Sequence, residues 1–473
     1  MGFWPAFLLF AIGTAGLFYL DRDRSVRTEK ALWLPVMWLW LVGSRPVSAW
    51  LAIWFGLGAA AGQGLDAQLD GSPMDAIVFM ALTAAALFVL FQRYRRTLSL
   101  LKTSGPLLLF FVYTLLSCLW SPFPDVAFKR WIKDVGDLAM MLVIATDPQP
   151  IAALRRVFAR VGFILLPASI LLIRYSAIGR AYDPSGGPMN TGVTTNKNTL
   201  GLITFTVALG ALWSLLSLLR TKRSPSRKRQ MIARAVLLAF GVAVLQQAHS
   251  ATSIACFILG AFLIMATRFS VFKHRPASVH ALVIGILLLG GISMMFGGEA
   301  TVASALGRDP SLSSRTDIWK AVIPICPNPL VGAGFESFWN GYGKFVTAGL
   351  SKYERGLNSA HDGYIEVYLN LGWVGIGFIA MLLISGYRRS CVAFRRNPEV
   401  GSLMLAYVAT ASIYSITEAG FRILTPTWLF LVLAIVGARI IALNGSNKGS
   451  KPAVGAGEQT VNAQANQQFA LVT

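Results

Sequence analysis

The sequence predicts an all-α fold, a polytopic transmembrane helical bundle of about 12–13 spans with one large outward-facing loop that contains short helices. Hydrophobic residues make up 55% of the 473 residues and charged residues only 13%. Soluble domains have about a quarter of their residues charged, so this composition indicates a membrane protein. The longest polar interruption, residues 299–360, is rich in aromatics and Pro-Gly turns, which favours an ordered, functional loop.

Each crossing needs about 20 mostly apolar residues, and the chain offers such stretches in sequence. The first, Phe3 to Leu20, has no basic residue before it and no small-residue cleavage site after it, so we expect an anchor rather than a signal peptide. Residues 1–443 are expected to form the membrane domain, and 444–473 a disordered cytoplasmic tail. The expected spans are 2–20, 31–44, 74–91, 106–121, 135–147, 161–176, 199–219, 231–248, 251–267, 280–298, 361–386, 402–417 and 426–443.

The net charge of +21 comes from short Lys/Arg clusters between apolar stretches, which indicate topology rather than nucleic-acid binding. The positive-inside rule places these clusters in the cytoplasm, against anionic membrane lipids. Segment 47–62 is interpreted as interfacial or re-entrant, because another crossing would break the alternation. The cytoplasmic clusters are 22–30, 92–102, 155–160, 220–229, 268–275 and 387–396, and the outward segments are 45–73, 122–134, 177–198, 299–360 and 418–425.

The four cysteines do not indicate a disulfide framework or a metal site. Cys118, Cys256, Cys326 and Cys391 are far apart and include no CxxC pair. No metal and no cofactor is therefore expected.

A polar outward segment leads directly into an apolar run at Asn196, Lys197 and Asn198. Backbone amides at the start of a helix are unsatisfied and favour anions, and Lys197 adds a positive charge. The alternative interpretation is an Asn cap beside a lysine at the membrane surface.

The large loop carries Arg308 and Arg315. A guanidinium donates two hydrogen bonds at once and stays protonated, so it suits a phosphate group. Each arginine has an alternative role in a structural ion pair, with Asp309 or Asp317. Trp339, near the end of this loop, either anchors at the interface or stacks on a sugar ring.

His361 lies at the outward end of an expected span. If the helix is continuous, His361 and Tyr368 share a face. Imidazole accepts protons near neutral pH, so His361 is a candidate general base, or else a hydrogen-bonded structural residue. Asp362 and Glu366 are placed to orient or replace it. Outward-facing residues of the last loop, Glu418 and Arg422, either complete the polar cluster or pair with each other.

Four segments together resemble the bacterial O-antigen ligase and polysaccharide polymerase superfamily, over about residues 190–385. They are TGVTTNKNTLG at 191–201, LGRDPSLSSRTDIW at 306–319, NPLVGAGFESFW at 328–339 and SAHDGYIEVYLNLGWVG at 359–375. The resemblance implies a multi-pass glycosyltransferase of the bacterial inner membrane whose active site, with the loop 299–360, faces the periplasm. It also implies an undecaprenyl-diphosphate-linked glycan as donor, lipid A core or a lipid-linked glycan as acceptor, and no metal.

The family roles fall on individual residues of this chain. The resemblance implies that Arg315 engages the diphosphate and His361 assists transfer. A further arginine before the NKN motif is expected to bind phosphate, and Arg174 and Arg180 both remain candidates. The family usually has Gly before the loop arginine and Asn after the histidine, where this chain has Ser314 and Asp362. The expected substrate-binding residues are Arg308, Lys197, Asn198, Arg180, Trp319 and Tyr364.

Two alternatives remain open at this point. Within the family, a ligase hands a finished glycan to the lipid A core, whereas a polymerase extends a lipid-linked chain. From another class, a polysaccharide or lipid-linked glycan transporter or flippase remains the alternative. Transporters typically carry charges near the midplane and internal repeats, whereas the expected spans are nearly free of charge and show no repeat.

Overall fold

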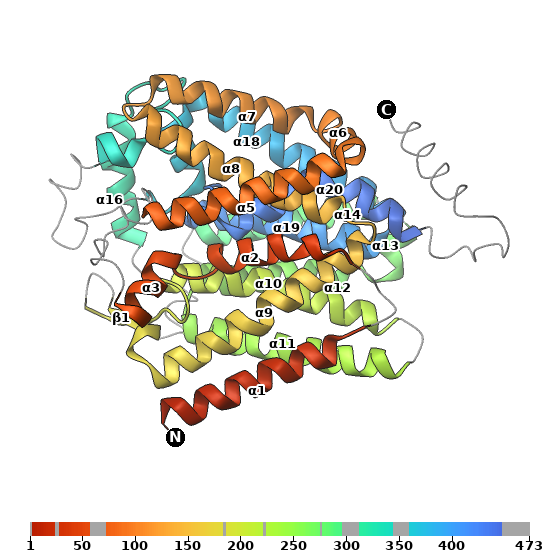
Figure 1. Ribbon diagram of the computed structural model, residues 1–473. Helices are drawn as coiled ribbons and strands as arrows, with labels where there is room; N and C mark the ends of the chain where they lie inside the picture. The colour runs from red at the N-terminus through yellow and green to blue at the C-terminus, as the bar shows by residue number, and fades with distance from the viewer. Residues whose placement is uncertain are drawn as a thin grey trace.

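The computed structural model describes residues 2–23, 28–56, 72–182, 186–220, 224–274, 277–295, 312–343 and 359–446. These residues form an all-α helical bundle, as predicted (Figure 1). The helices are α1 (Phe3–Asp21), α2 (Trp33–Val42), α3 (Val47–Phe55), α5 (Pro73–Gln92), α6 (Tyr94–Lys102), α7 (Gly105–Ser117), α8 (Pro124–Ala145), α9 (Pro150–Tyr175), α10 (Lys197–Leu218), α11 (Pro225–Ala248), α12 (Ala251–Ala266), α13 (Ser270–His274), α14 (Ala277–Met295), α16 (Leu312–Val322), α18 (Gly363–Arg396), α19 (Pro398–Thr417) and α20 (Pro426–Ser446).

Short elements join the helices. The single turns are η1 (Lys30–Leu32), η2 (Cys118–Trp120), η3 (Ala177–Gly179), η4 (Ile323–Ile325) and the π-helical η5 (Trp339–Gly343). One antiparallel pair, β1 (Arg180–Tyr182) with β2 (Pro188–Asn190), lies in the outward segment before the NKN motif, with Ala181 opposite Met189. The short helices expected in the large loop are α16, η4 and η5.

Every expected span overlaps a helix in the described residues, which makes the chain a multi-pass membrane protein. Seven helices are long and apolar enough to cross a bilayer, or up to nine if each bent pair counts as one span. The bent pairs are η1–α2 with α3, at 69°, and α6 with α7–η2, at 89°, while α12, α14 and α20 have shorter apolar portions. The bend between α2 and α3 fits either a broken span or the re-entrant segment expected at 47–62, of which residues 57–62 lie outside the described residues.

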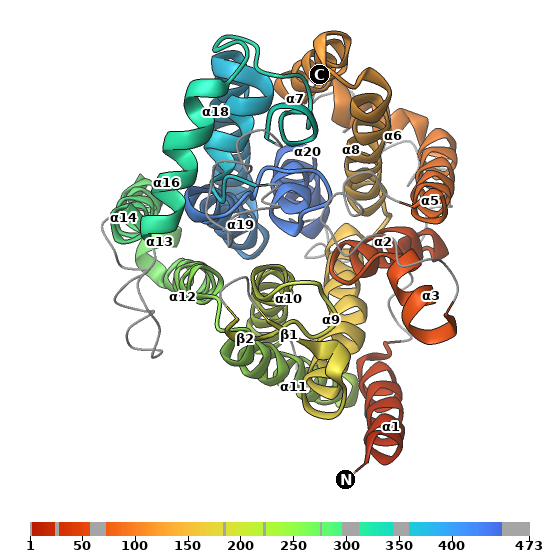
Figure 2. The same ribbon diagram turned by 90° about the vertical axis from the view of Figure 1, so that its left-hand side faces the viewer.

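α19 and α20 lie near the centre of the bundle, with α10 beside them and α18 toward the edge, viewed nearly end-on in Figure 2. α18, α19 and α20 pack on one another, and α10 packs on α9, α11 and α12. α1 lies at the periphery, where it packs on α9 and α11 but leaves Trp4, Leu9 and Ile12 more than 60% exposed. Such a surface is stable only against lipid, so α1 forms an outer wall of the bundle.

The helix α8 differs from the expectation. It begins at Pro124, so the expected outward loop 122–134 is largely helical. Its carboxylates Asp134 and Asp137 are buried and accept hydrogen bonds from the indole N–H groups of Trp428 (2.6 Å) and Trp38 (2.7 Å). The interior therefore contains more ionisable groups than the sequence suggested, and each of these two carboxyl groups accepts a hydrogen bond from an indole far away in the sequence.

α18 is broken at Gly372, whose φ of 63° and ψ of −163° interrupt the helix. The turn at 328–334 fills the break: Ala333 N–H donates to Leu369 O (3.0 Å) and Trp373 N–H to Pro329 O (2.9 Å). The expected continuous helical face from His361 through Tyr368 to Gly375 is therefore wrong beyond the break. Backbone groups freed by the break are satisfied by the inserted turn.

The bundle has two distinct ends (Figure 1). α16, α3 and the β1–β2 hairpin mark the site end, and α6 and α13 mark the opposite, basic end. Several of the basic clusters lie within helices rather than in loops, as 155–160 does in α9. Polar contacts hold these clusters to neighbouring segments at the basic end. These contacts are Arg93 with Glu29, Arg155 with Glu399 (2.5 Å), and Arg220 with the carbonyl of Arg268 (3.4 Å).

Candidate active site

Several of the predicted site residues, among them Asn198, Arg315 and His361, are brought together at the site end by four segments that are distant in sequence. They are the first turn of α10, the helix α16, the entry into α18, and the connection 418–425 between α19 and α20 (Figure 2). Each segment begins or ends a helix, so its polar groups lie where backbone hydrogen bonding is incomplete. The site therefore rests on rigid elements rather than on long loops.

The NKN motif forms the N-terminus of α10. Asn196 is the N-cap, and its side chain accepts a hydrogen bond from Thr199 N–H at 2.8 Å. Asn198 lies in the first turn, where its side-chain amide donates to Glu418 Oε1 at 2.6 Å. Lys197 acts electrostatically on the same carboxylate and lowers its pKa. Within the motif, Asn196 caps the helix, whereas Lys197 and Asn198 interact with Glu418.

Arg315 lies on α16 and pairs with Glu418, with 3.1 Å between Nη2 and Oε1. The Arg315 side chain is 16% exposed, so the pair is largely shielded from water. One turn further along α16, Trp319 Nε1–H donates to Ala360 O at 2.8 Å. This bond ties α16 to the residue immediately before His361.

His361 occupies the position before the N-cap of α18. Its φ of 49° is unusual for a residue with a Cβ, and such strain clusters at functional sites. Its Nδ1 lies 3.3 Å from Glu418 Oε2, and 35% of its side chain is exposed. In the tautomer protonated on Nδ1, the ring donates to Glu418 and keeps a lone pair on Nε2, as a general base requires.

Asp362 caps α18 rather than contacting the imidazole. Its Oδ1 accepts from Tyr364 N–H and Ile365 N–H, both at 2.8 Å. Burial raises the pKa of Asp362 to about 6, although these two backbone bonds lower it. The carboxylate that partners His361 comes instead from Glu418, 57 residues further along the chain.

Glu418 is the hub of the site. Its carboxylate is contacted by Asn198, Arg315 and His361, and its side chain is only 9% exposed. Burial raises the pKa of Glu418. His361, Arg315 and Lys197 together lower it by more than burial raises it, so the net shift of the pKa is downward. Glu418 is therefore ionised at neutral pH. The sequence indicated that it faces outward, but nothing local in TEAGFR showed which partners it would reach.

A second buried ion pair lies on the same connection. Both Nε and Nη2 of Arg422 contact Glu336 Oε2, at 3.1 and 2.9 Å. Arg130 of α8 donates to the backbone carbonyl of Glu336. Glu366 accepts both Trp339 Nε1–H, at 2.9 and 3.1 Å to its two oxygens, and Ala360 N–H, at 2.5 Å. These contacts fix the 335–339 turn and the residue before His361, so Glu418 and Arg422 do not pair with each other.

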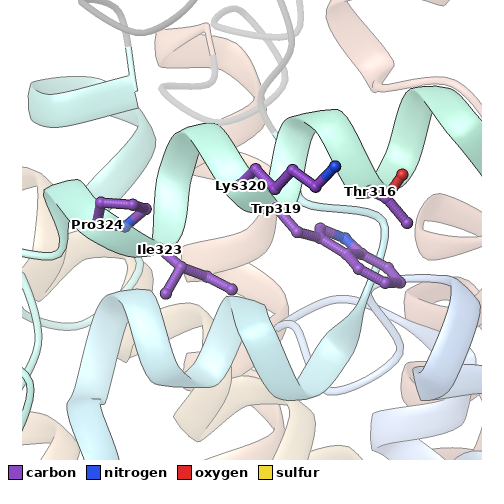
Figure 3. Close-up of a pocket in the computed structure, with 5 residues that line it drawn as sticks. All are labelled: Thr316, Trp319, Lys320, Ile323 and Pro324. Atoms are coloured by element: carbon purple, nitrogen blue, oxygen red, sulfur yellow. The ribbon is translucent and has the colours of Figure 1, made fainter.

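An open apolar groove runs along α16, starting at Thr316, the residue that follows Arg315 in sequence (Figure 3). It has a volume of about 450 Å³. Its lining residues recur along one side of the helix and of η4, and they are Thr316, Trp319, Lys320, Ile323 and Pro324. Since Trp319 also bonds Ala360, the groove is continuous with the segment that carries His361.

Other predicted residues lie apart from this hub. Arg180 is exposed on β1. Tyr364 directs its hydroxyl to Ser412 O at 3.1 Å and packs its ring on Phe421. Arg308 lies outside the described residues.

The sequence analysis missed Arg45, which reaches the segment before the NKN motif from the α2–α3 turn. Its Nη1 donates to Gly192 O at 2.9 Å and its Nη2 to Ile178 O at 2.6 Å. The available signal was an arginine in the Gly-Ser-Arg-Pro turn between two apolar runs, at the start of an outward segment.

Comparisons with known proteins agree with this architecture. Residues 191–380 match the family model described as O-antigen ligase. The chain is also 26% identical over 338 residues to the exopolysaccharide production protein ExoQ of Rhizobium meliloti (strain 1021), a match that covers 67% of this chain and 72% of ExoQ. Together these matches confirm the resemblance of this multi-pass membrane protein to the bacterial O-antigen ligase and polysaccharide polymerase superfamily.

Proposed function

We propose that this protein is an inner-membrane glycosyltransferase that transfers a glycan from undecaprenyl diphosphate to an acceptor hydroxyl on the periplasmic side. The observation that carries the proposal is the convergence of Arg315, His361 and Asn198 on one buried carboxylate. A guanidinium, an amide and a helix N-terminus suit a diphosphate, and an imidazole beside them suits a hydroxyl nucleophile.

The chemistry follows from these groups. The acceptor oxygen attacks the anomeric carbon, the bond from that carbon to the diphosphate oxygen breaks, and the diphosphate leaves with the electron pair. Arg315 and Lys197 stabilise the negative charge that accumulates on the leaving group without a metal ion. His361 Nε2 takes the proton of the acceptor hydroxyl. A single displacement of this kind inverts the anomeric centre.

The groove along α16 supports a lipid-linked donor. A diphosphate bound at Arg315 would place the carrier chain next to Trp319 and Ile323, whose apolar surfaces line the groove (Figure 3). The basic clusters at the opposite end of the bundle support a cytoplasmic position for that end, by the positive-inside rule. The site end then faces the periplasm, where lipid-linked glycans are presented.

The similarity to ExoQ favours a polymerase over a ligase, because ExoQ is described as an exopolysaccharide production protein. We infer a polymerase that extends a lipid-linked glycan. Lipid-linked and surface glycans from a deletion strain, sized on a gel, test this step. Loss of long chains with single repeats retained supports a polymerase, whereas uncapped lipid A core with long chains retained on the carrier identifies a ligase.

Substitution of the two central residues tests the transferase itself. We expect Arg315→Ala to lower transfer by roughly 10²–10³-fold, because a fixed positive group at the leaving diphosphate is lost. His361→Ala should lower it by roughly 10²–10⁴-fold, the usual effect of a general base. Transfer is measured with purified lipid-linked donor, and protein level by immunoblot.

Asp317→Ala is the matched control, because it lies on the same helix with its side chain 61% exposed. It should leave transfer unchanged. Wild-type transfer by either Arg315→Ala or His361→Ala, at normal protein level, would reject the site.

A further inference from the structure

Glu418 holds the groups that an incoming diphosphate needs. Its Oε1 accepts from both Arg315 Nη2 (3.1 Å) and Asn198 Nδ2 (2.6 Å), while its Oε2 lies near His361 Nδ1 (3.3 Å). One oxygen therefore faces the side of the site proposed to hold phosphate, and the other faces the candidate base. The two halves of the site share one negative charge.

A diphosphate and this carboxylate compete for the same donors. A phosphate oxygen at Arg315 Nη2 or Asn198 Nδ2 would replace Glu418 Oε1 or lie beside it. Glu418 is only 9% exposed, so a second anionic oxygen beside its carboxylate would be repelled strongly. The contact between Oε2 and His361 involves the other oxygen, so it can persist when Oε1 is displaced.

We propose that Glu418 is an exchangeable counter-ion, which neutralises Arg315 and accepts the hydrogen bond of Asn198 before the donor binds, and then acts as the carboxylate partner of His361. This inference rests on the proposed function and adds a positioning residue to it. After exchange, the carboxylate holds the Nδ1-protonated tautomer of His361 and stabilises the imidazolium that forms when Nε2 takes the acceptor proton.

A purely structural role for Glu418 predicts a different outcome. If the carboxylate only holds Arg315 in place, its neutralisation should weaken anion binding and transfer together. If it is a competing counter-ion, neutralisation should strengthen anion binding and weaken transfer. The two roles therefore predict opposite changes in anion affinity when Glu418 is neutralised.

The experiment measures binding of inorganic pyrophosphate to the full-length protein in detergent, by isothermal titration calorimetry. Glu418→Gln keeps the size and an acceptor oxygen but removes the charge. We expect pyrophosphate to bind on the order of tenfold more tightly to this variant than to the wild type. Glu336→Gln is the matched control, since Glu336 is similarly buried and paired with Arg422 at 2.9 Å, and it should leave pyrophosphate affinity unchanged.

Transfer kinetics supply the second measurement. For Glu418→Gln, both KM for the donor and kcat should fall, kcat by at least about tenfold because His361 loses its partner. Unchanged or weaker pyrophosphate binding by Glu418→Gln overturns the inference. Equal binding by wild type and Arg315→Ala instead defeats the diphosphate role of Arg315 itself, so the two failures are distinguishable.

A second variant covers the case in which Glu418→Gln does not fold. Glu418→Asp keeps the charge but shortens the side chain by one methylene, so it cannot span Arg315, Asn198 and His361 together. Tighter pyrophosphate binding than wild type supports the exchange, and weaker binding overturns it.

Discussion

Asp362 is adjacent to His361 in sequence, whereas Glu418 contacts it from 57 residues away, and the fold moves the pKa values of these two carboxyl groups in opposite directions. Burial raises the pKa of Asp362 to about 6, whereas the surrounding cations and His361 outweigh burial and lower the pKa of Glu418. The difference arises because Glu418 has charged donors, while Asp362 is satisfied mainly by backbone N–H groups. Proximity in sequence therefore does not decide which carboxylate serves the imidazole.

Asp362→Asn should stabilise the protein at pH 8. A carboxyl with a folded-state pKa of about 6, against an ordinary value of 3.8, stabilises the fold fully at low pH. That contribution is lost as pH rises through about 6, because the buried group must then ionise. Asparagine retains the cap and never ionises, so we expect a gain of about 1–2 kcal/mol at pH 8.

Thermal unfolding in detergent at pH 8 and pH 4.5 measures this gain, which should shrink at the lower pH. Asp317→Asn, an exposed carboxylate on α16, is the control and should change little at either pH. A gain that is larger at pH 4.5 than at pH 8 would contradict the assigned cause. Transfer should persist in Asp362→Asn, since the resembling family usually has Asn at this position.

At the scale of single residues, the sequence predicted which side chains could belong to the site but not which side chains contact one another. Arg315 and His361 were identified by their residue chemistry, by their outward position and by the family resemblance, and Asn198 by its position at a helix start. Their common contact, Glu418, lies 103, 57 and 220 residues away from them, and no periodicity or spacing rule reaches so far. The same holds for Arg45, which reaches Gly192 across 147 residues.

Among the elements, α18 departs most from its sequence pattern. The run from Gly363 is apolar with helical spacing, so it predicts one continuous helix. The break at Gly372 depends on the 328–334 turn, which supplies hydrogen bonds to the freed backbone groups. A single sequence does not distinguish a glycine that allows close helix packing from one, such as Gly372, at which the helix is interrupted.

Gly372→Ala tests the break. A Cβ at Gly372 would lie 2.2 Å from the carbonyl carbon and oxygen of Leu330, and the φ/ψ pair lies in a region open essentially to glycine. We expect a loss of at least about 3 kcal/mol in the free energy of unfolding, because neither the backbone clash nor the strain can relax cheaply. The thermal midpoint in detergent and the transfer rate should both fall.

Gly377→Ala in the same helix is the control, because a Cβ added to Gly377 would meet no heavy atom within 4 Å. This substitution should be neutral or slightly stabilising, as alanine favours a helix over glycine. If both variants unfold at the same temperature, α18 does not depend on the Gly372 break.

For the whole molecule, the sequence predicted the all-α class and the order of the helices, but it predicted the positions of the charged residues less well. Of the 12–13 expected spans, seven helices of the described residues, or up to nine with the bent pairs, are long and apolar enough to cross a bilayer. Apolar length and basic clusters are local properties, and each expected span contains helix. The segment 122–134 was expected to be an outward loop between two spans. It is helical from Pro124, and its polar groups have partners distant in sequence: Arg130 donates to the carbonyl of Glu336, and Asp134 accepts from the indole N–H of Trp428.

The membrane orientation can be tested with cysteines placed at the two ends. Lys320→Cys lies at the site end, where the native side chain is 80% exposed, and Arg95→Cys lies on the exposed surface of α6 at the basic end. In the proposed orientation, a membrane-impermeant maleimide labels Lys320→Cys in spheroplasts, and labels Arg95→Cys only after the membrane is permeabilised. The native cysteines Cys326 and Cys391 are replaced by serine to remove background, since both are partly exposed. The opposite labelling pattern would put Arg315 and His361 in the cytoplasm, away from any donor presented in the periplasm, and the proposed transfer reaction would then fail for lack of substrate.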